Sequence, residues 1–400
     1  MLTNRLAFAF GVFAFASALS AQTVETIPFR AVLSARNETT PVVDSTATGA
    51  ANIFLHVVRD GSGKIVSGSV DFTVSYKFAG AVSLTAMHIH KAPAGVAGPI
   101  VVPVAFTRTD DPTGVGNVAL KQTNVAAADT PTTGYDAVVG ILQDPSQFYF
   151  NIHSTDAPGG AMRGQLQRAD QAVLVGLMSP ANETPAITSP GTAVGSIIAY
   201  RTADAAGNPT SGFVIFDVNY TGFPSDTNFT GLHLHFGNAG TAGPVTINTG
   251  LRGPFPGAAS GSGNLHFEVE VDLTANLAAA TLNALFVDPS QVYINVHTSV
   301  FPGGAARDQL RKTDVTSLQL TLNTSEETPA PGALQASAPS AVTFYSVRNL
   351  DGSVPAAVVQ FDVNPRFPAG TNFTAMHIHD ADRKSTRLNS SHLGISYAVF

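Results

Sequence analysis

The chain has 400 residues, enough for two or three domains, and only 12% of them are charged. Its 36 Gly and 25 Pro residues favour a β-rich protein with many turns and argue against long helices. The net charge of −7 provides no basic surface for nucleic acid, and the absence of Cys excludes disulfides and thiolate metal sites.

Residues 1–21 have the layout of a signal peptide. Arg5 gives a positive start, residues 6–18 form an apolar run too short to span a membrane, and small residues follow up to Ala21. The alternative is an N-terminal core helix, which this order of charge, apolar run and small residues disfavours. We therefore expect an exported protein, secreted or held in the periplasm or cell envelope, with no membrane span.

The rest of the chain repeats itself every 144 or 145 residues. The motif His-x-His occurs three times at this interval, beginning at His88, His233 and His377. Each repeat opens with an acidic turn ending in Glu-Thr-Pro or Glu-Thr-Thr-Pro, and the first two close with Pro-Gly-Gly-Ala-x-Arg. Such self-similarity predicts consecutive domains joined by linkers so short that neighbours touch. The predicted domains are residues 23–168, 169–312 and, incompletely, 313–381.

Within a repeat, apolar and polar residues alternate, which is typical of strands with one buried face. Val70, Phe72, Val74 and Tyr76 show this pattern in the first repeat, and residues 267–273 show it in the second. One short helix per repeat is expected, at residues 135–142 and 278–286. Each complete repeat is therefore predicted to be all-β, an antiparallel, Greek-key-like sandwich or flattened barrel.

The last nineteen residues depart from the repeat. Residues 382–392 and 395–400 can be encoded by two consecutive stretches of a common sequencing adapter, and Leu393-Gly394 would span its index. We interpret residues 382–400 as translated adapter rather than protein. The third repeat is then cut after its His-x-His motif. We expect the natural product to be longer, and this half-domain to be poorly ordered or to lean on the second repeat.

The histidines are the candidate chemical groups. In a strand, residues i and i+2 point to the same side, so His88 and His90 present their imidazoles together. A strand ending at His153 adds a third imidazole if it lies alongside. Three imidazoles are a normal ligand set for zinc or copper, and no other cofactor is expected. The equivalent set in the second repeat is His233, His235 and His297.

Two interpretations of these histidines stay open. They either bind metal or are structural, hydrogen-bonded to the main chain or to Glu38 and Glu183 in the acidic turns. These turns are also a second source of metal ligands, through their carboxylate oxygens. Arg163 and Arg307, which begin the closing strands, either pair with the two glutamates or are surface charges. No nucleophile–base pair or pair of carboxylates has a catalytic spacing, so no catalytic residue is predicted.

These motifs together resemble the CHRD domain family, named after repeats in chordin. The likeness rests on the acidic turn, on residues 87–99 and on residues 151–166, and it covers nearly all of the first two repeats and half of the third. The second repeat departs from the first at Asp308, where the first has Gly164. The resemblance implies an extracellular or envelope β-domain.

A fainter likeness links the His-x-His strands to copper/zinc superoxide dismutase. It implies a similar topology, but that enzyme's bridging histidine and aspartate have no counterpart here, so dismutase activity is not predicted. We therefore predict an exported, non-enzymatic binding or structural protein whose partner is an extracellular protein or surface ligand. The alternative is a copper- or zinc-binding protein with a redox or metal-handling role. The sequence identifies neither the partner nor the oligomeric state.

Overall fold

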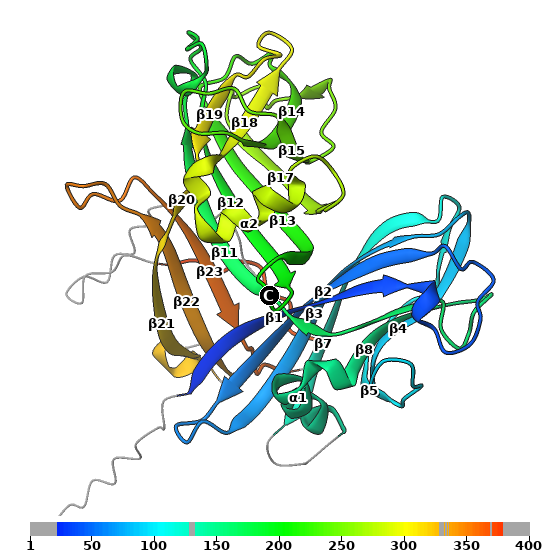
Figure 1. Cartoon of the computed structure of the whole chain (residues 1–400). Coiled ribbons are helices and arrows are strands. Elements are labelled where there is room, and N and C mark those ends of the chain that lie inside the picture. Colours follow the sequence, from blue (N-terminus) through cyan, green and yellow to red (C-terminus); the bar gives the residue numbers. More distant parts are fainter. Residues whose placement is uncertain are drawn as a thin grey trace, which may run out of the picture.

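The computed structural model describes residues 22–127, 133–327, 332, 334 and 336–378 except 369. Within them, nearly all regular structure is antiparallel strand, with one α-helix in each complete repeat, and the repeats form three lobes (Figure 1). The prediction of tandem all-β domains is confirmed. The predicted signal segment, residues 382–400 and His379 lie outside the described residues.

The first repeat forms one curled, ten-stranded sheet, in which β5-β4-β8-β9-β1-β2-β3-β7 lie side by side, β10 pairs with β1 and β6 pairs with β4. Its strands are β1 (Thr23–Ser34), β2 (Thr48–Arg59), β3 (Ile65–Lys77), β4 (Val82–Lys91), β5 (Ile100–Pro103), β6 (Thr109–Asp111), β7 (Val115–Ala127), β8 (Phe148–Ser154), β9 (Met162–Gln165) and β10 (Gln167–Arg168). The two ends of the sheet fold over one another and enclose a core.

The second repeat divides the same elements between two sheets, with the orders β17-β13-β12-β11-β20 and β15-β14-β18-β19, and β16 pairs with β14. Its strands are β11 (Asp170–Met178), β12 (Thr192–Ala203), β13 (Pro209–Thr221), β14 (Asn228–Phe236), β15 (Val245–Asn248), β16 (Phe255–Pro256), β17 (Gly263–Glu270), β18 (Val292–Thr298), β19 (Ala306–Gln309) and β20 (Arg311–Lys312). The helices α1 (Thr133–Gln143) and α2 (Ala278–Val287) lie where the sequence predicts them.

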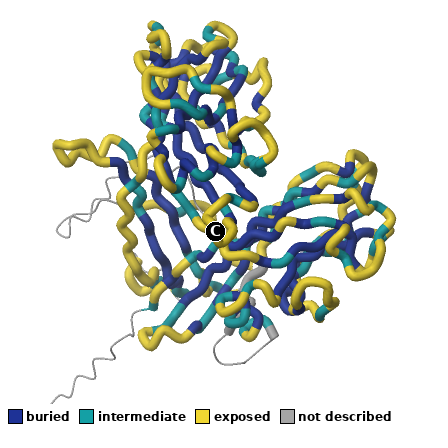
Figure 2. Tube along the Cα trace, viewed as in Figure 1, coloured by how far each residue is buried: buried dark blue, intermediate teal, exposed yellow. Residues whose placement is uncertain are grey.

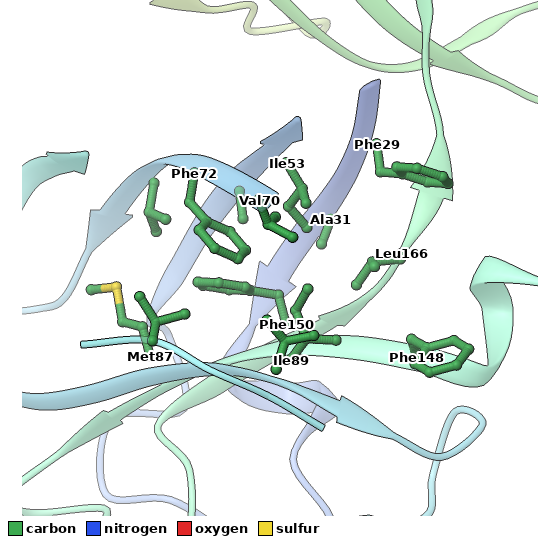
Figure 3. Close-up of a cluster of buried hydrophobic side chains, with 14 of the residues drawn as sticks. Phe29, Ala31, Ile53, Val70, Phe72, Met87, Ile89, Phe148, Phe150 and Leu166 are labelled. Carbon is green, nitrogen blue, oxygen red and sulfur yellow. The ribbon is translucent and has the colours of Figure 1, made fainter. Parts of the chain in front are cut away.

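The core of the first repeat follows the predicted alternation. Val70, Phe72, Val74 and Tyr76 are all buried. Figure 3 shows Phe72 facing Phe150 of β8 across this core, with their ring centroids 5.5 Å apart. Two sheet layers that interdigitate in this way bury the apolar face of every strand and leave the opposite face for polar groups.

The third repeat is a three-stranded sheet of β21 (Asp314–Asn323), β22 (Ser337–Val347) and β23 (Ala356–Val363). Leu318 and Leu322 are 53% and 43% exposed, whereas their counterparts Leu174 and Met178 are each 1% exposed under the second sheet of their own repeat. His377 is not in a strand. Without a described second layer, this half-domain leans on both other repeats rather than on the second repeat alone.

The three repeats meet through the outer faces of their first sheets, near β1 and β11 (Figures 1 and 2). The same position of the repeat, on the first strand of each lobe, contributes to this contact in all three lobes. In the first lobe, the buried Arg30 forms a 2.6 Å ion pair with the partly exposed Glu270 of the second. In the third lobe, the Gln319 amide bonds both main-chain groups of Val24 in the first. In the second lobe, Val175 belongs to an apolar cluster shared with the third.

Candidate metal centre

Strand alternation places the predicted histidines on one face of the sheet. Met87 and Ile89 in β4 are fully buried in the core, so His88 and His90 between and after them point to the opposite face. The neighbouring strand β8 runs antiparallel, with His88 opposite Asn151, and places His153 on the same face. In the second repeat, β14 and β18 hold their histidines in the same way.

The structure brings each predicted trio together. In each repeat, the trio's potential ligand nitrogens all lie within 4.8 Å of one another. The ring centroids of His88 and His153 are 5.1 Å apart, and those of His233 and His297 are 4.8 Å apart. Metal–nitrogen bonds of about 2.0–2.1 Å require nitrogens about 3.4 Å apart in a tetrahedral site. Small side-chain movements would therefore close the trio around an ion.

Main-chain carbonyls orient two imidazoles of each trio. Nδ1 of His90 donates to the Gly98 carbonyl and Nδ1 of His153 donates to the Pro158 carbonyl, each at 3.0 Å. A neutral imidazole that donates through Nδ1 has its lone pair on Nε2. Carbonyls bonded to the remote nitrogen are the usual outer partners of metal-binding histidines. The second repeat has the same bonds, from His235 to Gly243 and from His297 to Pro302, also at 3.0 Å.

One nitrogen of each imidazole in the trio is buried and has no hydrogen-bond partner. In the first repeat these nitrogens are Nδ1 of His88 and Nε2 of both His90 and His153. The same three atoms are unpaired in the second repeat. Because nearly all buried polar atoms in proteins are hydrogen-bonded, three unpaired imidazole nitrogens in one place require an explanation.

Electrostatics keep the trio neutral. Burial, with the neighbouring His153 and His90 adding to it, lowers the pKa of His88 to about 4. Burial also lowers the pKa of His233 and that of His235 to about 4. The pKa values of His90 and His153 shift in the same direction, again mainly through burial. Neutral imidazoles are the form that binds metal ions.

An aromatic ring and a guanidinium support the trio from one side. Tyr149 stacks on His90 with ring centroids 4.8 Å apart and planes 9° apart, and Arg163 lies 4.5 Å above the Tyr149 ring. The second repeat has the same stack. The role of Tyr149 was not predicted, although the pattern Tyr-x-Asn-x-His in both repeats, with its period of two, could have indicated it.

Arg163 differs from both sequence-based expectations. It is only 2% exposed, so it is no surface charge, and it forms no ion pair with Glu38 although the structure describes both residues. Its guanidinium instead donates to the carbonyls of Asn37, at 2.7 Å, and Val96, at 2.9 Å. Arg307 makes the equivalent bonds in the second repeat. The arginine therefore ties the acidic turn to the Gly-rich loop beside the histidines.

The glutamates of the acidic turns are not among the clustered ligand atoms of either trio; their carboxylates lie at Gly160 and Gly304, in the loop after the third histidine. Burial raises the pKa of Glu38 and that of Glu183 to about 7, an effect only partly offset by the nearby arginine. All motifs that repeat in the sequence thus converge here: the acidic turn, His-x-His, Asn-x-His and the Gly-Gly-x-x-Arg closing segment.

Fold and site together define a protein of tandem all-β domains, in which the first two repeats each hold a largely buried three-histidine cluster. A family model for the CHRD domain matches residues 29–166 and 174–310, more than half of the chain. The chain therefore belongs to the CHRD domain family, a family of non-enzymatic binding or structural domains, as its motifs predict. No curated protein and no solved structure matches it. Within the described residues, no helix is long and apolar enough to cross a membrane.

Proposed function

We propose that this is an exported, non-enzymatic metal-binding protein in which each complete CHRD domain binds one zinc or copper ion through its histidine trio. The observation that carries the proposal is the set of three buried, unpaired imidazole nitrogens within 4.8 Å, present twice. A structural role would use these nitrogens in hydrogen bonds. In two imidazoles of each trio the outward Nδ1 is bonded to a carbonyl, so the lone pair on the inward Nε2 is kept free.

The arrangement also suits ion binding energetically. Two ligands of each trio are held by carbonyls, and one of these two is also stacked on a tyrosine, so these two lose little side-chain freedom when an ion binds. Three nitrogen ligands leave a coordination position open for a further ligand. An open position suits a protein that receives and passes on an ion, which is the metal-handling role considered from the sequence.

Metal analysis of the full chain tests the proposal. After chelation and dialysis, we expect the chain to take up two zinc or copper ions, His153→Ala to take up one, and the His153→Ala/His297→Ala double variant to take up none. His266→Ala is the matched control, because His266 lies outside both trios and pairs with Asp217. We also expect saturating metal to raise the melting temperature, since an ion at 100 times its Kd stabilises a domain by about 2.7 kcal/mol.

The proposal fails if the chain with both trios intact binds neither ion at micromolar concentrations. The histidines would then be a structural polar network, and the domains would be binding modules without metal.

A further inference from the structure

The proposed site contains a buried carboxylate that the three ligands do not explain. If Gly160 carried a Cβ, that atom would lie 2.7 Å from Nδ2 of Asn151 and 2.8 Å from Oε2 of Glu38, so the amide and the carboxylate meet at this glycine. Asn151 lies directly opposite His88 in the ladder. Pro158, two residues before Gly160, accepts the bond that orients His153. The carboxylate therefore lies at the segments that neighbour two of the three ligands.

This carboxylate has no adequate partner in the protein. Oε1 of Glu38 and Oδ1 of Asn151 are both buried and unpaired. The nearby Arg163 partly offsets the desolvation of Glu38, but two of its nitrogens donate to main-chain carbonyls and its Nη2 is itself buried and unpaired. A largely desolvated carboxylate without a direct ion pair is costly, and such groups are normally paired or bound to metal.

The second repeat places the equivalent glutamate, asparagine and glycine together in the same way. Glu183 is buried, its Oε1 is unpaired, and so is Oδ1 of Asn295. A Cβ on Gly304 would lie 2.7 Å from the Asn295 amide nitrogen and equally close to a Glu183 oxygen. Because two sequences that differ at many positions keep the same unpaired carboxylate at the same place, the feature belongs to the site rather than to one packing accident.

A cation bound by the trio would account for the unpaired carboxylate. Three imidazoles carry no negative charge, so a bound divalent ion leaves its full charge in a medium of low dielectric constant. One carboxylate next to the ligand strands offsets part of that charge, and the ion in turn stabilises the desolvated carboxylate. The bound divalent ion and the desolvated carboxylate, each unfavourable by itself, therefore stabilise one another.

We infer that Glu38 and Glu183 are the charge-compensating residues of the two metal sites: they increase affinity for the cation without binding it directly. This inference rests on the proposed metal-binding function. Both glutamates are positioning residues, which act through Asn151 and Asn295 and the Gly-Gly loop rather than as ligands.

The test is Glu38→Gln in the full chain, titrated with zinc and with copper(II) against a competing chromogenic chelator. We expect the first-repeat site to lose affinity by about 10- to 100-fold, the usual effect of removing an outer-shell partner. The second-repeat site serves as the internal reference and should be unchanged. Glu183→Gln should give the reverse result. Glu25→Gln, which removes an exposed carboxylate paired with Arg59, should change neither site.

The stability of the metal-free variant separates this role from a structural one. Removal of a desolvated, unpaired carboxylate should leave the metal-free stability equal or higher. Unchanged affinity in Glu38→Gln would overturn the inference and leave the metal site itself standing. Lower affinity with an equal loss of metal-free stability would also overturn it, because the residue would then be structural. If the unmodified chain binds no metal, the proposed function fails first.

Discussion

The glycine pair in the closing loop gives a sharp test of how the site is assembled, because its two members have opposite surroundings. Gly160 has a φ of +135°, a region that residues with a Cβ rarely adopt, and its missing Cβ would lie between 2.7 and 2.9 Å from atoms of Asn151 and Glu38. Gly159, the residue before it, has nothing within 4 Å of its Cβ position. Gly160→Ala and Gly159→Ala are therefore the same substitution with different structural consequences.

The expected cost of Gly160→Ala has two parts. Holding a residue with a Cβ in this backbone region costs about 1–3 kcal/mol. The added methyl must also displace the Asn151 amide and the Glu38 carboxylate, and overpacking of this kind costs about 1–3 kcal/mol. We expect a total loss of about 2–6 kcal/mol in the free energy of unfolding of the first domain. At roughly 3 °C per kcal/mol for a domain of this size, the melting temperature should fall by about 6–18 °C.

Urea denaturation and calorimetry of the metal-free full chain provide the measurement. Gly159→Ala should stay within about 0.5 kcal/mol of the unmodified protein, as surface substitutions usually do. Gly304→Ala and Gly303→Ala repeat the comparison in the second domain, where the φ of Gly304 is +139° and the Gly303 Cβ position is again open. If Gly160→Ala proves as stable as Gly159→Ala, the described contact between loop, amide and carboxylate is incorrect.

Two further perturbations address the junction and the pH response. Arg30→Ala should destabilise the contact between the first two lobes by about 1.5–3 kcal/mol, because it removes the hydrogen bonds of a buried guanidinium to Ser211 and Glu270. Arg59→Ala, at an exposed pair, should cost under about 1 kcal/mol in the same denaturation assay. Equal effects of the two substitutions would contradict the contact at Arg30. The pKa of His88 and that of His233 are lowered to about 4 from an ordinary value near 6.5. Their contribution to the free energy of unfolding is therefore complete above pH 6.5 and is lost as the pH falls towards 4. The raised pKa values of Glu38 and Glu183 act in the opposite sense, so the effect should be measured in the metal-free Glu38→Gln/Glu183→Gln double variant. A free energy of unfolding that does not change between pH 7 and pH 4.5 in that variant would contradict the predicted contribution of the histidines.

The parts of the site that depend on strand parity could be predicted from the sequence. The period of two places His88 and His90 on one face, and the repeated spacing to His153 indicates a neighbouring strand with the third imidazole. The alternating apolar residues likewise predicted the core, and the repeat predicted the domain organisation. Each of these predictions rests on a single side-chain pattern that can be read directly from the sequence.

The remaining parts depend on main-chain groups, which leave no mark in a sequence. Arg163 was expected to find a carboxylate or the solvent, yet the loop geometry presents it with the carbonyls of Asn37 and Val96. The carbonyls that orient His90 and His153 are equally invisible before the loops are built. In the third repeat, the expected His-x-His strand does not form around His377, since no strand equivalent to β8 is described for it to pair with.

The joint between the lobes has a practical consequence for dissecting the molecule. In the second repeat, the outward side chains that it covers are apolar and buried: Val173, Val175, Ile198, Tyr200, Phe213 and Ile215. If this repeat were excised at its duplication boundaries, that patch would face water and promote self-association. The duplication boundaries are therefore poor places to cut the chain. Because the histidines of the first two repeats lie on other strands, the joint positions were free to diverge into Arg30, Val175 and Gln319 while the two ligand sets stayed alike.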